Sequence, residues 1–193
     1  DQEMSDFGTV GGNLLESAMS TAKIKDHYYA LALNTNSKIM FYNEEAFKEA
    51  GLEPPKTMDD FVNAVKKLSG KNKDGQQVWG LDEPALSGWN VLPYIWSYGG
   101  SITDENFTKA DGYVNSEATV KAVKMLADMY KNKEFTGFNS GDIPMTDGFG
   151  TGRYMMLLEG PWKTAEMAGG YPDFKYGTCE MPAGDGGSIS VLG

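Results

Sequence analysis

The chain alternates short apolar runs with segments in which apolar residues recur every three or four positions. This alternation is typical of α/β proteins, in which buried strands are separated by amphipathic helices. The pattern predicts strands at residues 28–33, 38–42, 78–81, 154–158, 176–182 and 189–192. It predicts helices at residues 13–24, 44–50, 58–68, 88–98, 117–130 and 143–150, a helix that begins near 161, and a loop at 1–12. We therefore predict an α/β fold, and we find no internal repeat.

Polar residues mark the ends of several predicted helices. Asn43, Thr57 and Ser116 each precede a helical pattern, and their side chains can accept hydrogen bonds from amides of the first turn. Gly51 follows one of these helices at the position where glycine commonly ends a helix. These signals predict helices that begin directly after the three caps.

The segment FGTGRYMMLLEGPW, residues 149–162, carries the clearest indication of a binding site. An apolar run ends at Glu159 and is followed by Gly160, Pro161 and Trp162, a sequence that predicts a strand, a tight turn and the start of a helix. Open α/β sheets bind small ligands at the carboxyl ends of their strands. Trp162 is therefore a candidate for stacking on the apolar face of a ligand; the alternative is that it caps the core.

Composition restricts the class of protein. The chain has 193 residues, enough for one domain or two small ones, and a formal net charge of −10. An acidic balance argues against binding to nucleic acid or to an anionic membrane surface. No apolar run reaches the length of a membrane span, and no signal peptide is visible. Because the chain begins with Asp1, we expect that it has been processed or excised, with any localisation signal outside it.

The residues that most enzymes and metal sites need are scarce. His27 is the only histidine and Cys179 the only cysteine, so a catalytic triad, a histidine metal site and an internal disulfide are not expected. Cys179 is expected to be a buried structural thiol, and Arg153 to form a surface salt bridge. We predict no metal and no cofactor. The enzyme alternative is a glycoside hydrolase fragment with Glu83 and Glu159 as its carboxylate pair.

Five segments resemble the extracellular solute-binding proteins that deliver sugars to ABC importers (family 1, maltose-binding-protein-like). The segment at 149–162 resembles that family's FxxGkxAMxxxGPW pattern, and the others occur in the family's order. They are YALALNTNSKIMFYNEEAFKEAGLEPPKTMDDF, LDEP followed by WNVLPYIWSYGG, NSEATVKAV, and EMPAG. Together they cover residues 28–193.

The resemblance implies a fold and a domain division. Family members have two α/β lobes that trap a ligand between them, joined by strands that cross a hinge. We therefore expect residues 1–37 to be the tail of the first lobe with a hinge-crossing strand. Residues 38–193 are expected to be the second, C-terminal lobe, a periplasmic-binding-protein-like lobe with a central mixed sheet flanked by helices.

The resemblance also suggests polar ligand-binding residues. Asn36 lies in the expected crossing strand, where its side chain can hydrogen-bond a sugar hydroxyl; the alternative is a turn asparagine. Glu83, before Pro84, matches the position at which some oligosaccharide binders place a carboxylate; the alternative is a solvated loop acid. Ala85 stands where such binders can carry an aromatic residue, and Trp89 can substitute for it.

The predicted function is therefore that of a non-enzymatic substrate-binding component of an ABC transporter. The expected ligand is a sugar or oligosaccharide, bound by Asn36, Glu83, Trp89 and Trp162. The expected partner is a membrane permease, with a monomeric state, no nucleic acid, and a periplasmic or lipid-anchored cell-surface location. A non-sugar solute and an interaction domain without a small ligand remain alternatives.

Overall fold

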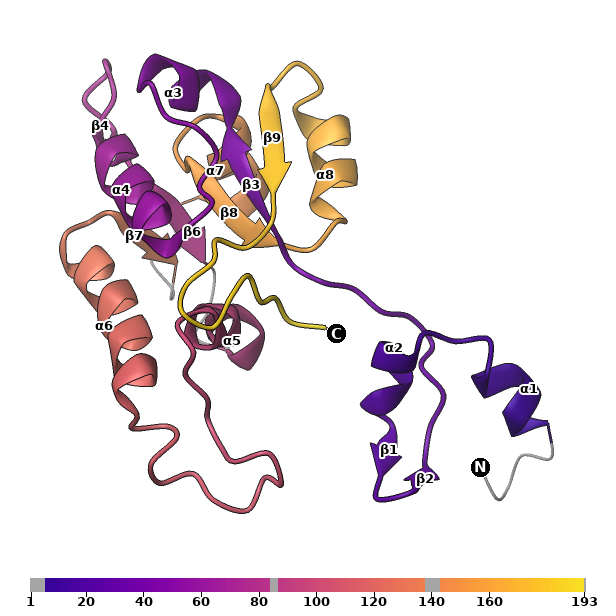
Figure 1. The fold of residues 1–193 in the computed structure, drawn as a ribbon. Coiled ribbons are helices and arrows are strands. Elements are labelled where there is room, and N and C mark those ends of the chain that lie inside the picture. Colours follow the sequence, from indigo (N-terminus) through magenta and orange to yellow (C-terminus); the bar gives the residue numbers. More distant parts are fainter. Residues whose placement is uncertain (1–5, 84–86, 138–142, 193) are drawn as a thin grey trace. The chain divides into compact units, whose positions relative to one another are not determined.

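A computed structural model describes residues 6–83, 87–137 and 143–192 of the chain (Figure 1). Its contacts divide the chain into two compact units. Unit 1 comprises Asp1–Ser37 with Leu192–Gly193, and unit 2 comprises Lys38–Val191.

Unit 1 contains short elements only. They are α1 (Phe7–Gly11), α2 (Glu16–Ser20), and the antiparallel pair β1 (Lys23–Ile24) and β2 (His27–Tyr28). Three predictions are therefore wrong in part. The predicted loop at 1–12 contains the helix α1, and the predicted helix over 13–24 is helical only at Glu16–Ser20. The predicted strand over 28–33 has strand structure only at Tyr28. Residues 29–36 have no regular secondary structure, and Leu33 is 98% exposed. An apolar run becomes a strand only when a neighbouring strand pairs with its backbone, and residues 29–33 have no such neighbour among the described residues of unit 1.

Unit 2 is built on a five-stranded mixed sheet in the order β7-β6-β8-β3-β9. These strands are β7 (Phe135–Gly137), β6 (Leu81–Glu83), β8 (Met156–Glu159), β3 (Ile39–Asn43) and β9 (Tyr176–Cys179). β6 runs parallel to β7 and β8, whereas β3 runs antiparallel to β8 and β9. The predicted central mixed sheet is confirmed. A separate hairpin joins β4 (Gly70–Lys71) and β5 (Gln77–Val78).

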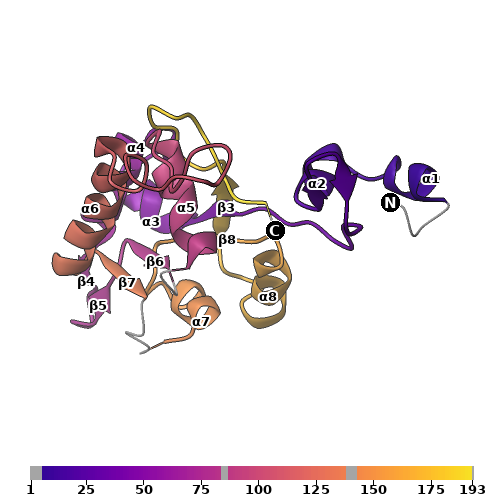
Figure 2. The ribbon, with the colours of Figure 1, turned by 90° about the horizontal axis from the view of Figure 1, so that it is seen from below.

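Helices cover both faces of this sheet (Figures 1 and 2). One face carries α3 (Glu44–Glu49), α4 (Met58–Leu68), α5 (Gly88–Ser97) and α6 (Glu117–Lys131), and the other carries α7 (Met145–Gly150) and α8 (Lys163–Gly170). Alternation along the strands divides the core accordingly. Met40 packs on the four-helix side, and its neighbour Phe41 packs with Phe149 and Leu157 on the other.

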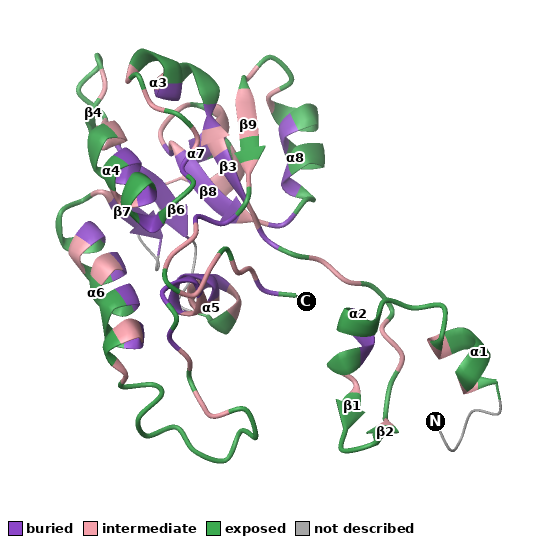
Figure 3. Cartoon of the chain, in the orientation of Figure 1, coloured by how far each residue is buried: buried purple, intermediate pink, exposed green. Residues whose placement is uncertain are grey.

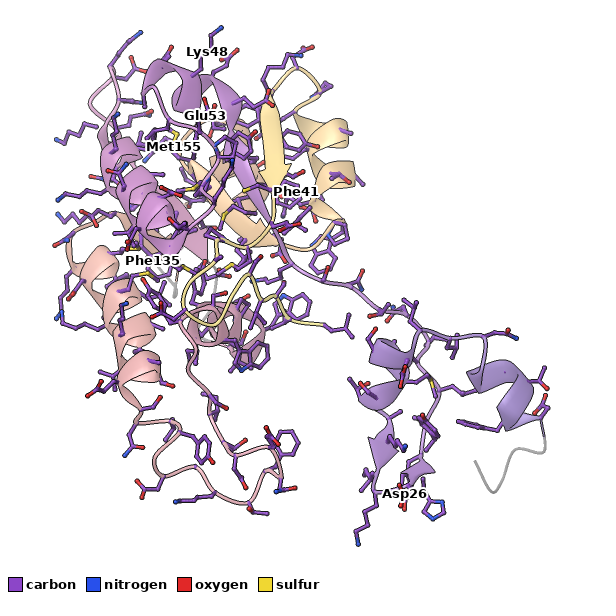
Figure 4. All side chains as sticks on the ribbon, viewed as in Figure 1. Asp26, Phe41, Lys48, Glu53, Phe135 and Met155 are labelled. Carbon is purple, nitrogen blue, oxygen red and sulfur yellow. The ribbon has the colours of Figure 1, made fainter. Side chains whose placement is uncertain are left out.

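Burial follows this layering, with buried residues concentrated in the strands and on the inner helix faces (Figure 3). The side chains are dense around the sheet, where Phe41 lies on the interior strand β3, between β8 and β9 (Figure 4). Unit 2 thus has three layers, α/β/α, with a hydrophobic cluster on each face of the sheet.

The predicted helix starts are confirmed. Asn43 accepts a hydrogen bond from the amide of Ala46 at 3.0 Å, and Ser116 accepts one from the amide of Thr119 at 3.3 Å. Thr57 forms a reciprocal capping box with Asp60. Gly51, with φ of 64°, follows the end of α3 in the left-handed region.

The predicted last strand over 189–192 is wrong. The amide of Ile189 donates to Ser97 Oγ at 3.3 Å, and the Ser190 hydroxyl donates to the carbonyl of Lys38 at 2.8 Å. The segment is held by side-chain hydrogen bonds instead of a strand ladder, because the glycine-rich turn at 184–187 packs closely against the end of α5.

Candidate functional site

The carboxyl ends of the parallel strands β6 and β8 meet at one edge of the sheet. β3 is antiparallel to β8, and Ile39 pairs with Glu159, so the first residue of β3 reaches the same edge. The first turn of α5 follows β6, and α8 follows β8. This edge, at which open α/β sheets bind ligands, therefore gathers Lys38, Glu83 and the turn that ends in Trp162.

Two indoles are exposed together at this edge. The rings of Trp89, on α5, and Trp162, at the start of α8, stack with their centroids 6.3 Å apart and their planes 20° apart. Trp162 is 41% exposed and Trp89 is partly buried. Trp162 is therefore not a core cap. The sequence suggested each tryptophan separately, and the structure brings them into one surface, the tryptophan pair.

The position of Trp162 depends on a close approach to Gly160. A Cβ atom at Gly160 would lie 2.1 Å from Cζ3 of the Trp162 ring, which leaves no room for a side chain. We expect Gly160→Ala to displace the ring and to reduce ligand affinity about tenfold, a loss of about 1.4 kcal/mol. Isothermal titration calorimetry and tryptophan fluorescence measure both effects.

The matched control is Gly169→Ala on α8, the helix that follows this turn, where a Cβ meets nothing within 4 Å. It is expected to leave binding unchanged, because alanine is tolerated in a helix better than glycine. Equal affinity for Gly160→Ala and the wild type would show that the ring position is unimportant.

A buried polar network lies beneath the tryptophan pair. Lys38 Nζ donates to Glu83 Oε1 at 2.8 Å and to Asn90 Oδ1 at 2.6 Å, and the Tyr94 hydroxyl donates to Glu83 Oε2 at 3.1 Å. We call these four residues the Lys38 network. The side chains of Lys38 and Glu83 are both fully buried. Burial raises the pKa of Glu83, and the adjacent Lys38 ammonium opposes this rise by favouring the charged carboxylate.

This environment changes the interpretation of Glu83. It ends strand β6 with 0% exposure, so the alternative of a solvated loop acid is wrong. Each carboxylate oxygen already has a protein partner. Its participation in binding stays a prediction, and the geometry favours an indirect role. Pro84 and Ala85 lie outside the described residues.

Sequence reasoning missed Lys38 and Tyr94. The available signal was a lysine at the start of an otherwise apolar strand, KIMFY, where a charged residue requires a partner.

Asn36 belongs to unit 1 and is partly buried in a segment without strand structure. The expected crossing strand is therefore wrong at this residue, and its role in binding stays a prediction.

A second buried acid lies on the opposite side of β6. Asp82 is 4% exposed, and burial raises its pKa from 3.8 to about 7, with Lys163 opposing and Glu159 assisting the rise. A carboxyl group with a higher pKa in the folded state binds more protons there than in the unfolded state. Its contribution to stability is therefore complete below pH of about 3.8 and is lost as the pH rises through about 7.

We accordingly expect the free energy of unfolding to fall across this pH window, and to fall less steeply in Asp82→Asn. Urea denaturation at a series of pH values measures the slope. Asp128→Asn is the control, because Lys124 lowers the pKa of that exposed carboxyl and so gives it the opposite pH dependence. An unchanged slope in Asp82→Asn would contradict this assignment.

Other candidate groups have structural partners. Arg153 Nε donates to the carbonyl of Gln77 at 2.6 Å and its guanidinium lies 5.5 Å from the Trp79 ring centroid, so these contacts take the place of the expected surface salt bridge.

Cys179 is partly buried, and burial raises its pKa to about 11, which disfavours the reactive thiolate at neutral pH. Beside Cys179 lies a cavity of about 650 Å³, which the tryptophan pair does not line.

The described residues offer neither a metal site nor a membrane-spanning helix. They contain no group of three or more His, Cys, Asp or Glu side chains placed to hold a metal ion. Within the same ranges, no helix has both the length and the apolar character needed to cross a membrane.

The α/β/α unit with aromatic side chains at the carboxyl edge of its sheet defines a ligand-binding lobe of the periplasmic-binding-protein type. Sequence comparison is specific about the family. The chain belongs to the bacterial extracellular solute-binding protein family, whose profile matches residues 2–192.

Three similar proteins illustrate this membership. The sn-glycerol-3-phosphate-binding periplasmic protein of Pectobacterium atrosepticum is 30% identical over 81% of this chain and 35% of its own length. The multiple sugar-binding protein of Streptococcus mutans is 24% identical over 89% of this chain and 42% of its own length. The structure of an ABC substrate-binding protein from Listeria monocytogenes in complex with cycloalternan matches with a TM-score of 0.75 and 26% identity, over 94% of this chain and 46% of that one. The chain thus spans less than half the length of these relatives.

Proposed function

We propose that this chain is the substrate-binding component of a bacterial ABC importer and that its ligand is a sugar or oligosaccharide. In this proposal residues 1–37 belong to the first lobe and its crossing, and residues 38–193 form the second lobe. The tryptophan pair is the observation that carries the proposal. Sugars present C–H faces that pack on aromatic rings, and two adjacent indoles offer a surface for more than one sugar ring.

The charges at this edge support a neutral ligand over a phosphate ester. Lys38 is neutralised by Glu83, and Lys163 forms an ion pair with Glu166 at 2.6 Å. A phosphate needs unpaired cations or several free amides, and both of these buried ammonium groups are already engaged. A glycerol phosphate remains the second candidate, because the relative from P. atrosepticum is named for that ligand.

The two carboxylates nominated for a glycoside hydrolase are both hydrogen-bonded within the protein. Glu83 is fully buried in the Lys38 network and Glu159 Oε1 accepts from the amide of Gly160 at 2.8 Å, so the two carboxylates are not free to flank a glycosidic bond. We therefore propose a binding function without covalent chemistry. The proposed partner is a membrane permease, and the proposed setting is the periplasm or the cell surface, with a monomeric, lipid-anchored form as one possibility to test.

Thermal-shift screening tests the proposal directly. The chain and the complete protein are heated with a panel containing maltose, maltotriose, mannobiose, cycloalternan and sn-glycerol 3-phosphate. A ligand that binds the native state raises the melting temperature by mass action, by an amount set by its concentration relative to Kd. A shift with a saccharide supports the proposal. A shift with glycerol phosphate alone would transfer it to the second candidate, and no shift in the complete protein would overturn it.

A further inference from the structure

Lys38 has an environment that direct ligand binding does not explain. It is 2% exposed, and its ammonium donates hydrogen bonds to Glu83 and Asn90 within the protein. A buried ion pair is weak evidence for stabilisation, because desolvating both charges offsets most of their attraction. A buried lysine at the ligand edge therefore calls for an explanation other than stability.

The contacts of Lys38 converge on the first turn of α5. Asn90 accepts its hydrogen bond at 2.6 Å, and the ring centroid of the preceding residue, Trp89, lies 5.9 Å from Nζ. An ammonium at this distance is attracted to the indole face. Lys38 thus contacts two consecutive residues of the helix that presents Trp89. Its ammonium also donates to Glu83, and the Tyr94 hydroxyl donates to the other oxygen of that carboxylate.

The orientation of the Trp89 ring in turn determines how the two rings of the tryptophan pair stack. Its ring stacks on that of Trp162, which directly precedes α8 and follows a different strand, β8. No hydrogen bond joins the two rings, so their alignment depends on how each backbone and each ring is held. Gly160 fixes the Trp162 side by close packing.

We propose that Lys38 is a positioning residue that holds Trp89 in its stack with Trp162 without touching the ligand. The inference rests on the proposed function, because it concerns the surface to which the ligand binds. It assigns the buried ion pair to the alignment of the binding surface. Glu83 holds the Lys38 side chain in place through its hydrogen bond, and Lys38 in turn fixes Trp89.

The test separates alignment from stability. Lys38→Met alone leaves a buried, unpaired Glu83, which destabilises the fold. The double variant Lys38→Met/Glu83→Gln removes both charges with little change in volume and is expected to fold, since neutral replacements of buried ion pairs are commonly tolerated. Lys124→Met, which breaks the exposed ion pair with Asp128 on α6, is the control.

The readout is the exciton couplet that two closely stacked indoles give in far-ultraviolet circular dichroism, assigned with Trp89→Phe and Trp162→Phe. The double variant is expected to lose most of this couplet and to bind the saccharide about fivefold more weakly, the range of one cation–π contact. The Lys124→Met control is expected to keep both.

Two outcomes distinguish this inference from the proposed function. A folded double variant with an unchanged couplet overturns the role of Lys38, whatever ligand the wild type binds. A couplet that depends on Lys38 in a protein that binds no saccharide leaves the positioning role intact and overturns the proposed function.

Discussion

Replacing Trp162 with alanine is expected to weaken saccharide binding about thirtyfold, a loss of about 2 kcal/mol, which is typical of an aromatic anchor at a binding surface. The substitution removes the more exposed member of the tryptophan pair and leaves Trp89 without a neighbour. Isothermal titration calorimetry with the saccharide found in the thermal screen measures the change. Because Trp162 is 41% exposed, the melting temperature is expected to change little.

Phe107→Ala is the control for this measurement. Phe107 is also an exposed aromatic residue, 86% accessible, and it lies outside the tryptophan pair. Its replacement is expected to leave affinity unchanged. Trp162→Phe is expected to fall between the wild type and Trp162→Ala, because a smaller ring covers less of the sugar. A saccharide affinity of Trp162→Ala equal to that of the wild type would show that this residue is not the stacking surface.

Phe41→Ala is expected to lower the free energy of unfolding by about 3–5 kcal/mol, the usual cost of a large cavity in a close-packed core. Phe41 is 0% exposed on the interior strand β3, where it packs near Phe149 and its ring centroid lies 5.9 Å from that of Tyr176. Strands flank β3 on both sides and helices cover both faces, so the site has little freedom to collapse. Urea denaturation monitored by circular dichroism measures the loss.

Phe107→Ala again supplies the comparison, because it makes the same chemical change at an exposed position. Its free energy of unfolding is expected to stay within about 0.5 kcal/mol of the wild type. A similar loss in both variants would mean that Phe41 is not part of a packed core.

The fold of unit 2 could be predicted from the sequence because its signals are local. The caps at Asn43, Thr57 and Ser116 and the apolar run that ends at Glu159 depend on neighbours within a few residues. The failures involve segments without such support. Residues 29–33 are apolar enough to form a strand, but strand formation depends on a partner that no local pattern reveals.

The candidate site was predicted only in part, for a related reason. The turn before Trp162 has a local signature, and Trp89 stands in an aromatic segment. The stack between them and the ion pair of Lys38 with Glu83 join residues that are far apart in the chain. Such pairings depend on the order of strands in the sheet, which a single sequence does not determine. The family resemblance singles out Glu83 as a candidate ligand carboxylate, but no local pattern reveals its burial or its pairing with Lys38.

The position of β3 in the sheet has a consequence for how the chain acquires its structure. β3 lies early in the sequence, yet both of its neighbours, β8 and β9, come from the last quarter of the chain. A growing polypeptide that has not reached Met156 contains β3 but neither of its neighbouring strands. Closing such long loops slows folding, because the entropy of closure is lost before the contacts form. The five-stranded sheet therefore cannot be completed until residues 156–179 have been synthesised.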